Sequence, residues 1–258
     1  MAPPPPKTTI WLWSFGLFPR RILYYLRAKN ISLSVLATHN IHLVPVLLAG
    51  SSLISAPGHE ARPPNTSLPC MRVEHGDGST LWVHESAAVM EYLEEVFGVA
   101  DAYPDLRGAS IQQRAKARDI VSLLTDALFW GTLHMTNALP VTLAWSGLQA
   151  HEMHADTAAH ALRKHGAVLD RLEEWARGDV LGKGSMSIAG DGTGTTVADV
   201  VLLAQVEYLK AMYGVDWCEG REVLGVWWER TMGQEWVIGN EELGGVEGTG
   251  DWEGILGK

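Results

Sequence analysis

The first hundred residues carry apolar positions spaced as short strands and amphipathic helices. Residues 10–13 form a short aromatic run that suits a buried strand. A helix is predicted next, because Pro19 is favoured in a first helical turn and helical spacing relates Ile22, Tyr25, Leu26 and Lys29. Asn30 suits a left-handed stop for this helix. Residues 31–36 alternate apolar and polar and predict a second strand, which would complete a βαβ unit.

A β-hairpin and another helix are predicted before the first hundred residues end. Residues 70–73 and 80–83 are strand-like runs on either side of an Asp-Gly turn. Residues 86–97 carry one apolar stripe at helical spacing and predict an amphipathic helix. The stretch 38–66 is ambiguous, since residues 44–49 suit either a strand or a short buried helix.

The second half of the chain is predicted to contain helices only. Long helical patterns cover residues 111–133 and 154–177, and a glycine-rich loop covers residues 178–194. Thr196 and Asp199 form a capping-box pattern at the start of the next helix. That helix is apolar nearly all round, so we expect it in the middle of a domain.

These elements divide the chain into two domains. We predict an α/β domain over residues 8–100, preceded by a flexible arm over residues 1–7. An all-helical domain is predicted over residues 108–238, and the glycine-rich, acidic residues 239–258 are predicted to be a loose tail.

Charge and cysteine content exclude several function classes. The net charge is −10, and no run of Lys and Arg is longer than Arg20 and Arg21, which argues against nucleic acid and anionic membrane surfaces as partners. The two cysteines cannot form a disulfide framework and fit a reducing compartment. The chain has no secretory signal pattern and no apolar run long enough to span a bilayer. We therefore expect a cytoplasmic protein that binds neither nucleic acid nor membranes.

Three short motifs together resemble those of the glutathione transferase family. Residues 63–69 resemble the segment that carries the family's cis-proline, and Glu85 with Ser86 resembles its acidic-Ser pair at a helix start. The capping box at Thr196 resembles that of the family's central helix. The resemblance covers nearly the whole chain and implies a thioredoxin-like α/β domain followed by an all-helical domain. Residues 18–21 and 24–31 further resemble fungal members, some of which serve secondary metabolism.

The resemblance implies a glutathione site in the first domain. Ser86 at a helix N-terminus would bind the γ-glutamyl carboxylate, and Glu85 the ammonium group. A cis bond before Pro69 would present the Leu68 backbone to the cysteinyl part, as an added strand does. The backbone near Leu17 would face the thiol. For the glycyl carboxylate, the candidates in the ambiguous segment are His59 and Arg62.

The family's usual thiol-activating side chains are missing from this chain. A gap-free alignment places Leu12, Gly16 and Phe18 at the positions where members carry a tyrosine, serine, cysteine or asparagine. Ser14 is the only nearby hydroxyl and is the candidate catalytic residue. The alternatives are thiolate stabilisation by the N-terminus of the Pro19 helix, or a thiol that is not activated.

The second substrate is expected in an apolar pocket between the domains. The candidates for its lining are Phe15, Trp130, His134 and Asn137. Such a pocket fits a hydrophobic electrophile, which glutathione would attack to give conjugation or cis–trans isomerisation. No metal is expected, because His151 and His154 lack the spacing of a zinc-binding helix. The resemblance also implies a homodimer, and the alternative function is a non-catalytic binding or dimerisation module.

Overall fold

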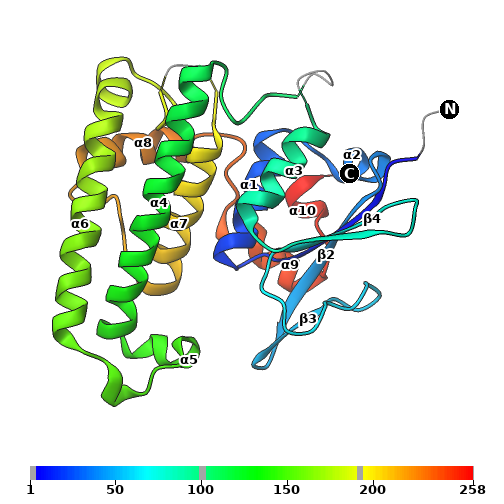
Figure 1. Cartoon of the computed structure of the whole chain (residues 1–258), viewed down its shortest axis with the longest axis horizontal. Helices are drawn as coiled ribbons and strands as arrows, with labels where there is room; N and C mark the ends of the chain where they lie inside the picture. The colour runs from blue at the N-terminus through cyan, green and yellow to red at the C-terminus, as the bar shows by residue number, and fades with distance from the viewer. Residues whose placement is uncertain (1–3, 99–102, 191–193, 258) are drawn as a thin grey trace. The chain divides into compact units, whose positions relative to one another are not determined.

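The computed structural model describes residues 4–98, 103–190 and 194–257 (Figure 1). It divides into two compact units, one of Met1–Leu106 with Thr231–Lys258 and the other of Arg107–Arg230. The predicted helical domain therefore ends near residue 230, and the residues after it belong to the first unit. Of the predicted arm, residues 1–3 lie outside the described residues and Lys7 already belongs to a strand.

The first unit is built on a five-stranded sheet in the order β3-β2-β1-β4-β5. β1 is parallel to β2 and antiparallel to β4, and the two outer strands pair antiparallel with their neighbours. The side chains of Ile10, Trp11 and Leu12 are fully buried, so the central strand is covered on both faces. The strands are β1 (Lys7–Trp13), β2 (Ile41–Ala49), β3 (Ser52–Ser55), β4 (Cys70–Glu74) and β5 (Thr80–Val83).

Two helices, α1 (Leu17–Ala28) and α2 (Leu33–Thr38), lie between β1 and β2 in the sequence. A third helix, α3 (Ser86–Val96), follows β5. Asn30 adopts a φ of 58° just after α1, which confirms the predicted left-handed stop. The strand predicted over residues 31–36 is wrong. This stretch begins α2 instead, because the Ser32 hydroxyl accepts a hydrogen bond from the Val35 amide and caps the helix.

The ambiguous segment between residues 38 and 66 contains strands rather than a helix. β2 is the true parallel partner of β1, and it turns back directly into β3. A loop then leads to Leu68-Pro69 and β4, so the described chain has no helix between Ala49 and Cys70.

The prediction of a loose tail over residues 239–258 is wrong, because this segment forms two helices. These are α9 (Asn240–Thr249) and α10 (Glu253–Leu256), which contact β2 and α1 respectively (Figure 1). The five apolar side chains that anchor them are buried: Leu243, Val246, Trp252, Ile255 and Leu256. The apolar residues of this segment follow helical spacing, but its many glycines disfavour a helix, so the sequence did not predict one.

The second unit is all-helical, as predicted. Its helices are α4 (Ile111–Ala138), α5 (Leu143–Ser146), α6 (Ala155–Arg177), α7 (Val197–Tyr213) and α8 (Glu222–Met232). Shorter turns, two of them 3₁₀ and the last π-helical, cover Pro140–Thr142, Ala150–Glu152 and Gly178–Gly182. α4 packs against α6 and α7, and α7 is buried along most of its length, as its apolar sequence predicted.

The capping box predicted at the start of α7 is present and extends into a larger network. The Asp199 carboxylate accepts hydrogen bonds from the Thr196 amide at 2.8 Å and the Ile188 amide at 2.7 Å. It also accepts from the Ser187 hydroxyl at 2.6 Å and from the indole N–H of Trp227 at 2.8 Å. One buried carboxylate thus joins α7, α8 and the preceding loop, which satisfies donors that would otherwise be unpaired.

Candidate functional site

The N-terminus of α1 offers backbone N–H groups that the helix itself does not use. Gly16 is the capping residue and has no side chain to satisfy them, and the first turn holds no acidic residue. Pro19, at the third helical position, has no N–H, so Leu17 and Phe18 supply the available amides. A side chain at Gly16 would place its Cβ 2.9 Å from the Pro19 ring, so the chain needs glycine here. This end of α1 carries a partial positive charge that favours an anion such as a thiolate.

Ser14, Phe15 and Leu17 lie together in and beside the turn between β1 and α1. Phe15 and Leu17 are partly exposed there. Ser14 is fully buried, and its hydroxyl has no hydrogen-bond partner among the described residues. The turn therefore presents backbone amides and apolar side chains on its outside, with the one hydroxyl beneath them.

The Leu68-Pro69 peptide bond is cis, as the motif predicted. The β1–β4 ladder ends at the pair Trp11 and Cys70, so Leu68 lies just beyond the paired backbone. The Leu68 side chain packs on a buried cluster that includes Trp11 and Cys70. Burial raises the pKa of the Cys70 thiol, which makes this cysteine a poor nucleophile.

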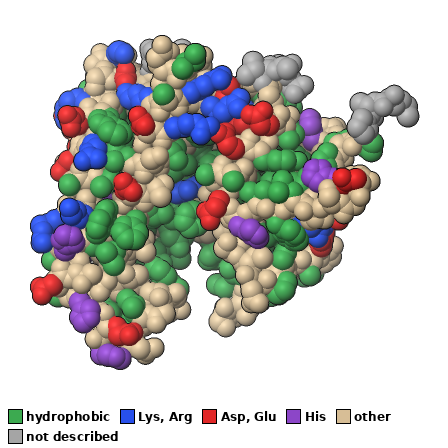
Figure 2. Space-filling view, viewed as in Figure 1, with side chains coloured by type: hydrophobic (Ala, Val, Ile, Leu, Met, Phe, Trp, Pro, Cys, Tyr) green, Lys and Arg blue, Asp and Glu red, His purple; other side chains and the backbone are tan. Residues whose placement is uncertain are grey.

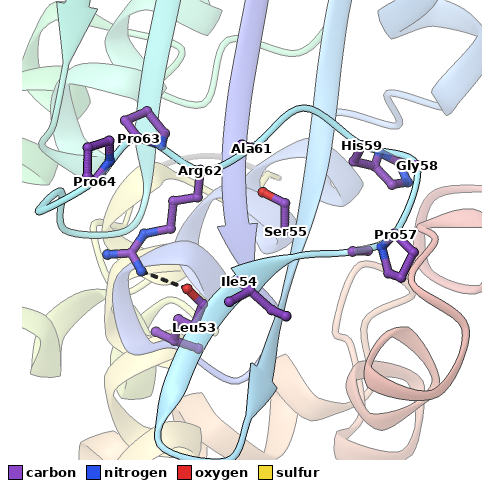
Figure 3. Close-up of a pocket in the computed structure, with 11 residues that line it drawn as sticks. Leu53, Ile54, Ser55, Pro57, Gly58, His59, Ala61, Arg62, Pro63 and Pro64 are labelled. Carbon is purple, nitrogen blue, oxygen red and sulfur yellow. Dashed lines mark hydrogen bonds between the residues drawn. The ribbon is translucent and has the colours of Figure 1, made fainter.

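A hollow of about 450 Å³ lies under β3 and the loop that follows it, where both glycyl-carboxylate candidates are found (Figure 3). The Arg62 guanidinium turns away from His59 and donates to the Leu53 carbonyl at 3.0 Å and to the Thr66 carbonyl. Arg62 therefore holds the two ends of the loop together. His59 is exposed at the other end of the hollow and keeps its side chain available.

The N-terminus of α3 is a second uncapped helix end. Glu85 occupies the capping position, but its exposed side chain makes no capping hydrogen bond, and the first turn contains no acidic residue. Ser86 opens the helix and is only 3% exposed. Its amide and those of the next two residues have no partner within the helix. This pair lies where the sequence motif placed it, directly after the hairpin.

Arg21 reaches this helix end from α1 and was not predicted as a site residue. Its Nη1 donates to the Ser86 hydroxyl oxygen at 3.3 Å, and its side chain packs 4.9 Å from the centre of the Phe18 ring. Burial lowers the pKa of Arg21 to about 10, and the charge of Glu85 opposes this shift. The available signal was the spacing of Arg21, four residues before Tyr25, which puts it on the buried stripe of α1.

The predicted second-substrate residues on α4 make contacts with α6 and its first residues. His134 Nδ1 lies 3.0 Å from the Ala158 carbonyl oxygen, and the Asn137 side-chain oxygen accepts from the His154 amide at 3.0 Å. Trp130 makes an edge-on aromatic contact with a histidine of α6. Their assignment to a second-substrate pocket stays a prediction.

A different stripe of α4 lines a hollow of about 390 Å³. Its six residues follow helical spacing: Thr125, Leu128, Phe129, Thr132, Leu133 and Thr136. Phe129 is 60% exposed, and Figure 2 shows hydrophobic side chains reaching the surface over this unit. α4, the helix expected to line an apolar pocket, thus has an apolar stripe that reaches the surface.

The sequence predicts neither a metal site nor a membrane-spanning helix. Within residues 4–98, 103–190 and 194–257, no three His, Cys, Asp or Glu side chains are grouped as a metal site requires. No helix in the described part of the chain is both long and apolar enough to cross a membrane. The histidines at residues 151 and 154 are exposed.

Comparison with known proteins gives structural relatives only. No family model and no curated protein matches the chain. A glutathione S-transferase from Methylobacillus flagellatus with glutathione bound aligns with a TM-score of 0.61 at 14% identity, over 89% of this chain and 96% of that one. Poplar glutathione transferase F1 aligns with a TM-score of 0.59 at 20% identity, over 94% and 99% of the two chains. A maleylacetoacetate isomerase from Anaeromyxobacter dehalogenans with bound glutathione reaches 0.56 at 18% identity, over 90% and 93%.

This chain has the glutathione transferase fold. The likeness confirms the predicted fold class, an α/β thioredoxin-like unit combined with an all-helical one. Within that fold, the uncapped ends of α1 and α3 and the cis bond before Pro69 occur in one unit.

Proposed function

We propose that this chain is a glutathione-dependent enzyme in which the thiolate of glutathione attacks an apolar electrophile. One observation carries the proposal: the same compact unit presents two uncapped helix N-termini and the cis Leu68-Pro69 loop. Each helix end favours an anion, and glutathione has an anion for each, its γ-glutamyl carboxylate and its thiolate. The loop between them offers backbone groups beyond the sheet ladder.

Each part of glutathione has a proposed contact in the first unit. The Ser86 hydroxyl and amide bind the γ-glutamyl carboxylate, and exposed Glu85 attracts the ammonium group. The Leu68 backbone pairs with the cysteinyl residue as an added strand would. His59 is the remaining candidate for the glycyl carboxylate, since Arg62 is engaged by the loop.

Thiolate stabilisation rests on the amides of Leu17 and Phe18 at the N-terminus of α1. Ser14 is the secondary candidate, because its hydroxyl is unpaired but fully buried beneath the turn. Replacing Ser14 with alanine separates the two. If the amides suffice, the pKa of bound glutathione, followed by thiolate absorbance, stays unchanged in this variant.

The reaction begins with formation of a bond between the glutathione sulfur and an electrophilic carbon. If a proton is then added and the adduct leaves, the product is a conjugate. If rotation about the former double bond is followed by loss of the thiolate, the product is an isomer and glutathione is regenerated. Neighbours of both kinds bind glutathione, a transferase and an isomerase, which supports either outcome. Glutathione consumed per turnover distinguishes them.

Calorimetry with glutathione tests the proposal directly. Ser86→Ala should weaken binding by roughly 1–3 kcal/mol, the cost of losing a charge-assisted hydrogen bond. Ser122→Ala, an exposed serine of α4, is the matched control and should bind as the unmodified chain does. Absence of glutathione binding at millimolar concentration would refute the proposed function.

A non-catalytic binding module is the second candidate. It is favoured by the lack of an activating side chain at Leu12, Gly16 and Phe18, together with the burial of Ser14. A module of this kind would bind glutathione without lowering the pKa of its thiol. The same thiolate titration therefore decides between the candidates.

The setting of the enzyme is part of the same proposal. The likeness of residues 18–21 and 24–31 to fungal family members supports a role in fungal secondary metabolism, with an apolar electrophile as substrate and a cytoplasmic location. We propose a homodimer, as the family resemblance implies. Light scattering on the purified chain measures this assembly, and a monomer would exclude it.

A further inference from the structure

α9 contacts the turn between β1 and α1 at two positions on one face of the helix. Gly244 and Glu247 are three residues apart, which places them on the same side of α9. A Cβ at Gly244 would lie 3.7 Å from the tip of the Phe15 ring, and the Glu247 carboxylate accepts a hydrogen bond from the Trp13 indole N–H at 2.5 Å. This helix therefore lies against the turn on which the proposed thiolate site depends.

Trp13 connects this contact to the N-terminus of α1. Its carbonyl accepts from the Gly16 amide at 3.0 Å and closes the turn, and the Gly16 carbonyl accepts from the Arg20 amide at 2.9 Å at the start of the helix. The Trp13 ring also covers Gly16, because a Cβ at Gly16 would lie 3.3 Å from the ring carbon Cε3. The direction of the Leu17 and Phe18 amides therefore depends on where Trp13 is held.

The Glu247 carboxylate is itself held in place and can therefore fix the Trp13 ring. An indole has one N–H and no acceptor, so a single hydrogen bond sets the direction of its polar edge. The acceptor of this bond is ionised, which makes the bond stronger than one between neutral groups. The other carboxylate oxygen accepts from the Leu48 backbone amide of β2 at 3.2 Å. Glu247 thus ties the indole to the backbone of the neighbouring strand.

We propose that Glu247 is a positioning residue for the glutathione thiolate: it holds Trp13, and Trp13 holds the turn that directs the Leu17 and Phe18 amides toward the sulfur. The inference rests on the proposed function, because it names what keeps those amides in place when no side chain activates the thiol. Glu247 acts through Trp13 and does not contact the sulfur. Its negative charge alone would disfavour a nearby thiolate, so positioning and charge have opposite effects on the pKa of the bound thiol.

Calorimetry with two ligands tests the inference, at a pH where the bound thiol is ionised. The first ligand is glutathione, and the second is S-methylglutathione, whose sulfur cannot ionise. Glu247→Ala removes the acceptor of the indole hydrogen bond, and Trp13→Phe removes its donor. We expect each change to weaken glutathione binding by about three- to tenfold, the size of the interaction between an anion and a helix N-terminus. Affinity for S-methylglutathione should stay unchanged, because this ligand brings no charge to the amides.

Titration of the bound thiol by its thiolate absorbance separates positioning from charge. Glu247→Ala and Trp13→Phe should both raise the thiol pKa, and the double variant should raise it no further than one change alone. Glu247→Gln should remain close to the unmodified chain, because its amide oxygen can still accept from Trp13. A thiol pKa that falls in Glu247→Ala and Glu247→Gln, and is unchanged in Trp13→Phe, would overturn the inference in favour of a charge effect.

Glu241→Ala is the matched control, since it removes an exposed carboxylate from the same helix and should leave both affinities and the thiol pKa unchanged. All variants are compared below the melting temperature of the least stable one. Equal weakening of both ligands by Glu247→Ala would show that Glu247 serves the fold alone, and no weakening of either would likewise contradict the inference. Failure of the unmodified chain to bind glutathione would instead refute the proposed function.

Discussion

The indole of Trp13 donates a hydrogen bond to the carboxylate of Glu247, with 2.5 Å between Nε1 and Oε1. The other oxygen of the same carboxylate accepts from the Leu48 amide at 3.2 Å. Trp13 ends β1 and Leu48 lies in β2, so one residue of α9 joins two neighbouring strands. α9 is therefore fastened at the point where the chain turns toward the N-terminus of α1.

Loss of this carboxylate should destabilise the chain. Glu247→Ala removes the acceptor of both hydrogen bonds, and we expect the free energy of unfolding to fall by roughly 1–3 kcal/mol. Urea unfolding measures the change. Glu241→Ala is the control, because Glu241 is an exposed residue of the same helix, and it should change stability by less than about 0.5 kcal/mol. Equal effects of the two variants would show that the Trp13 contact contributes nothing.

The buried ion pair between Lys29 and Glu94 predicts non-additive mutations. Lys29 Nζ lies 2.9 Å from Glu94 Oε2, both side chains are at most 1% exposed, and Lys29 also donates to the Pro104 carbonyl at 2.7 Å. Lys29→Met leaves the carboxylate buried and unpaired, so we expect a loss of roughly 3–5 kcal/mol. The double variant with Glu94→Met should lose less than Lys29→Met alone. A simple sum of the two single effects in chemical unfolding would contradict the pairing.

Glycines inside α9 should be replaceable with a gain in stability. A Cβ at Gly245 or Gly248 would have no atom within 4 Å, and neither residue requires a positive φ. Each change to alanine should therefore raise the free energy of unfolding by about 0.5–1 kcal/mol. Gly250→Ala is the contrasting variant, since its φ is +71° and its Cβ would lie 3.1 Å from Ala56. It should lower the melting temperature, whereas the other two raise it.

The buried His165 predicts a specific dependence of stability on pH. Burial lowers the pKa of His165 below its ordinary value of 6.5, with the charges of Arg221 and His134 acting in the same direction and the Ala127 carbonyl opposing them. Below that pH the unfolded chain therefore binds a proton more readily than the folded one. The contribution of His165 to stability is complete above about pH 6.5 and declines as the pH falls.

Unfolding by urea at several pH values, compared between the unmodified chain and His165→Gln, isolates this contribution. The stability difference between the two proteins should be constant above about pH 6.5 and should shift in favour of the variant at lower pH. A difference that is independent of pH down to 5 would mean that His165 titrates normally in the folded chain.

Local patterns predicted several elements of both units, and their failures have specific causes. The hairpin, α3 and the capping box at Thr196 follow from short-range spacing, and the structure contains all three. The alternation of residues 31–36 was misinterpreted, because a serine that alternates with apolar residues also caps a short helix. α9 was missed because its glycines contradict helical propensity, while Leu243 and Val246 gain their stability from contacts distant in sequence.

The candidate site likewise contains residues that short motifs predicted and one residue that they did not. Leu68-Pro69 and Ser86 belong to short motifs and were predicted, with the cis bond as expected. Arg21 could not be identified as a site residue, because its meeting with Ser86 depends on how α1 packs against α3. The spacing along a helix shows which residues share a face, but the partner of that face depends on the rest of the fold.

The return of residues 231–258 to the first unit imposes an order on biosynthesis. The helical unit is continuous from Arg107 to Arg230, so it can close while the end of the chain is still being translated. The core of the first unit is completed only when Trp252, at the start of α10, and Ile255, within α10, have been synthesised. Until then the nascent polypeptide exposes apolar surface from its earliest strands, and chaperones have their longest opportunity to bind there. The half of the molecule that is made first is thus the last to be finished.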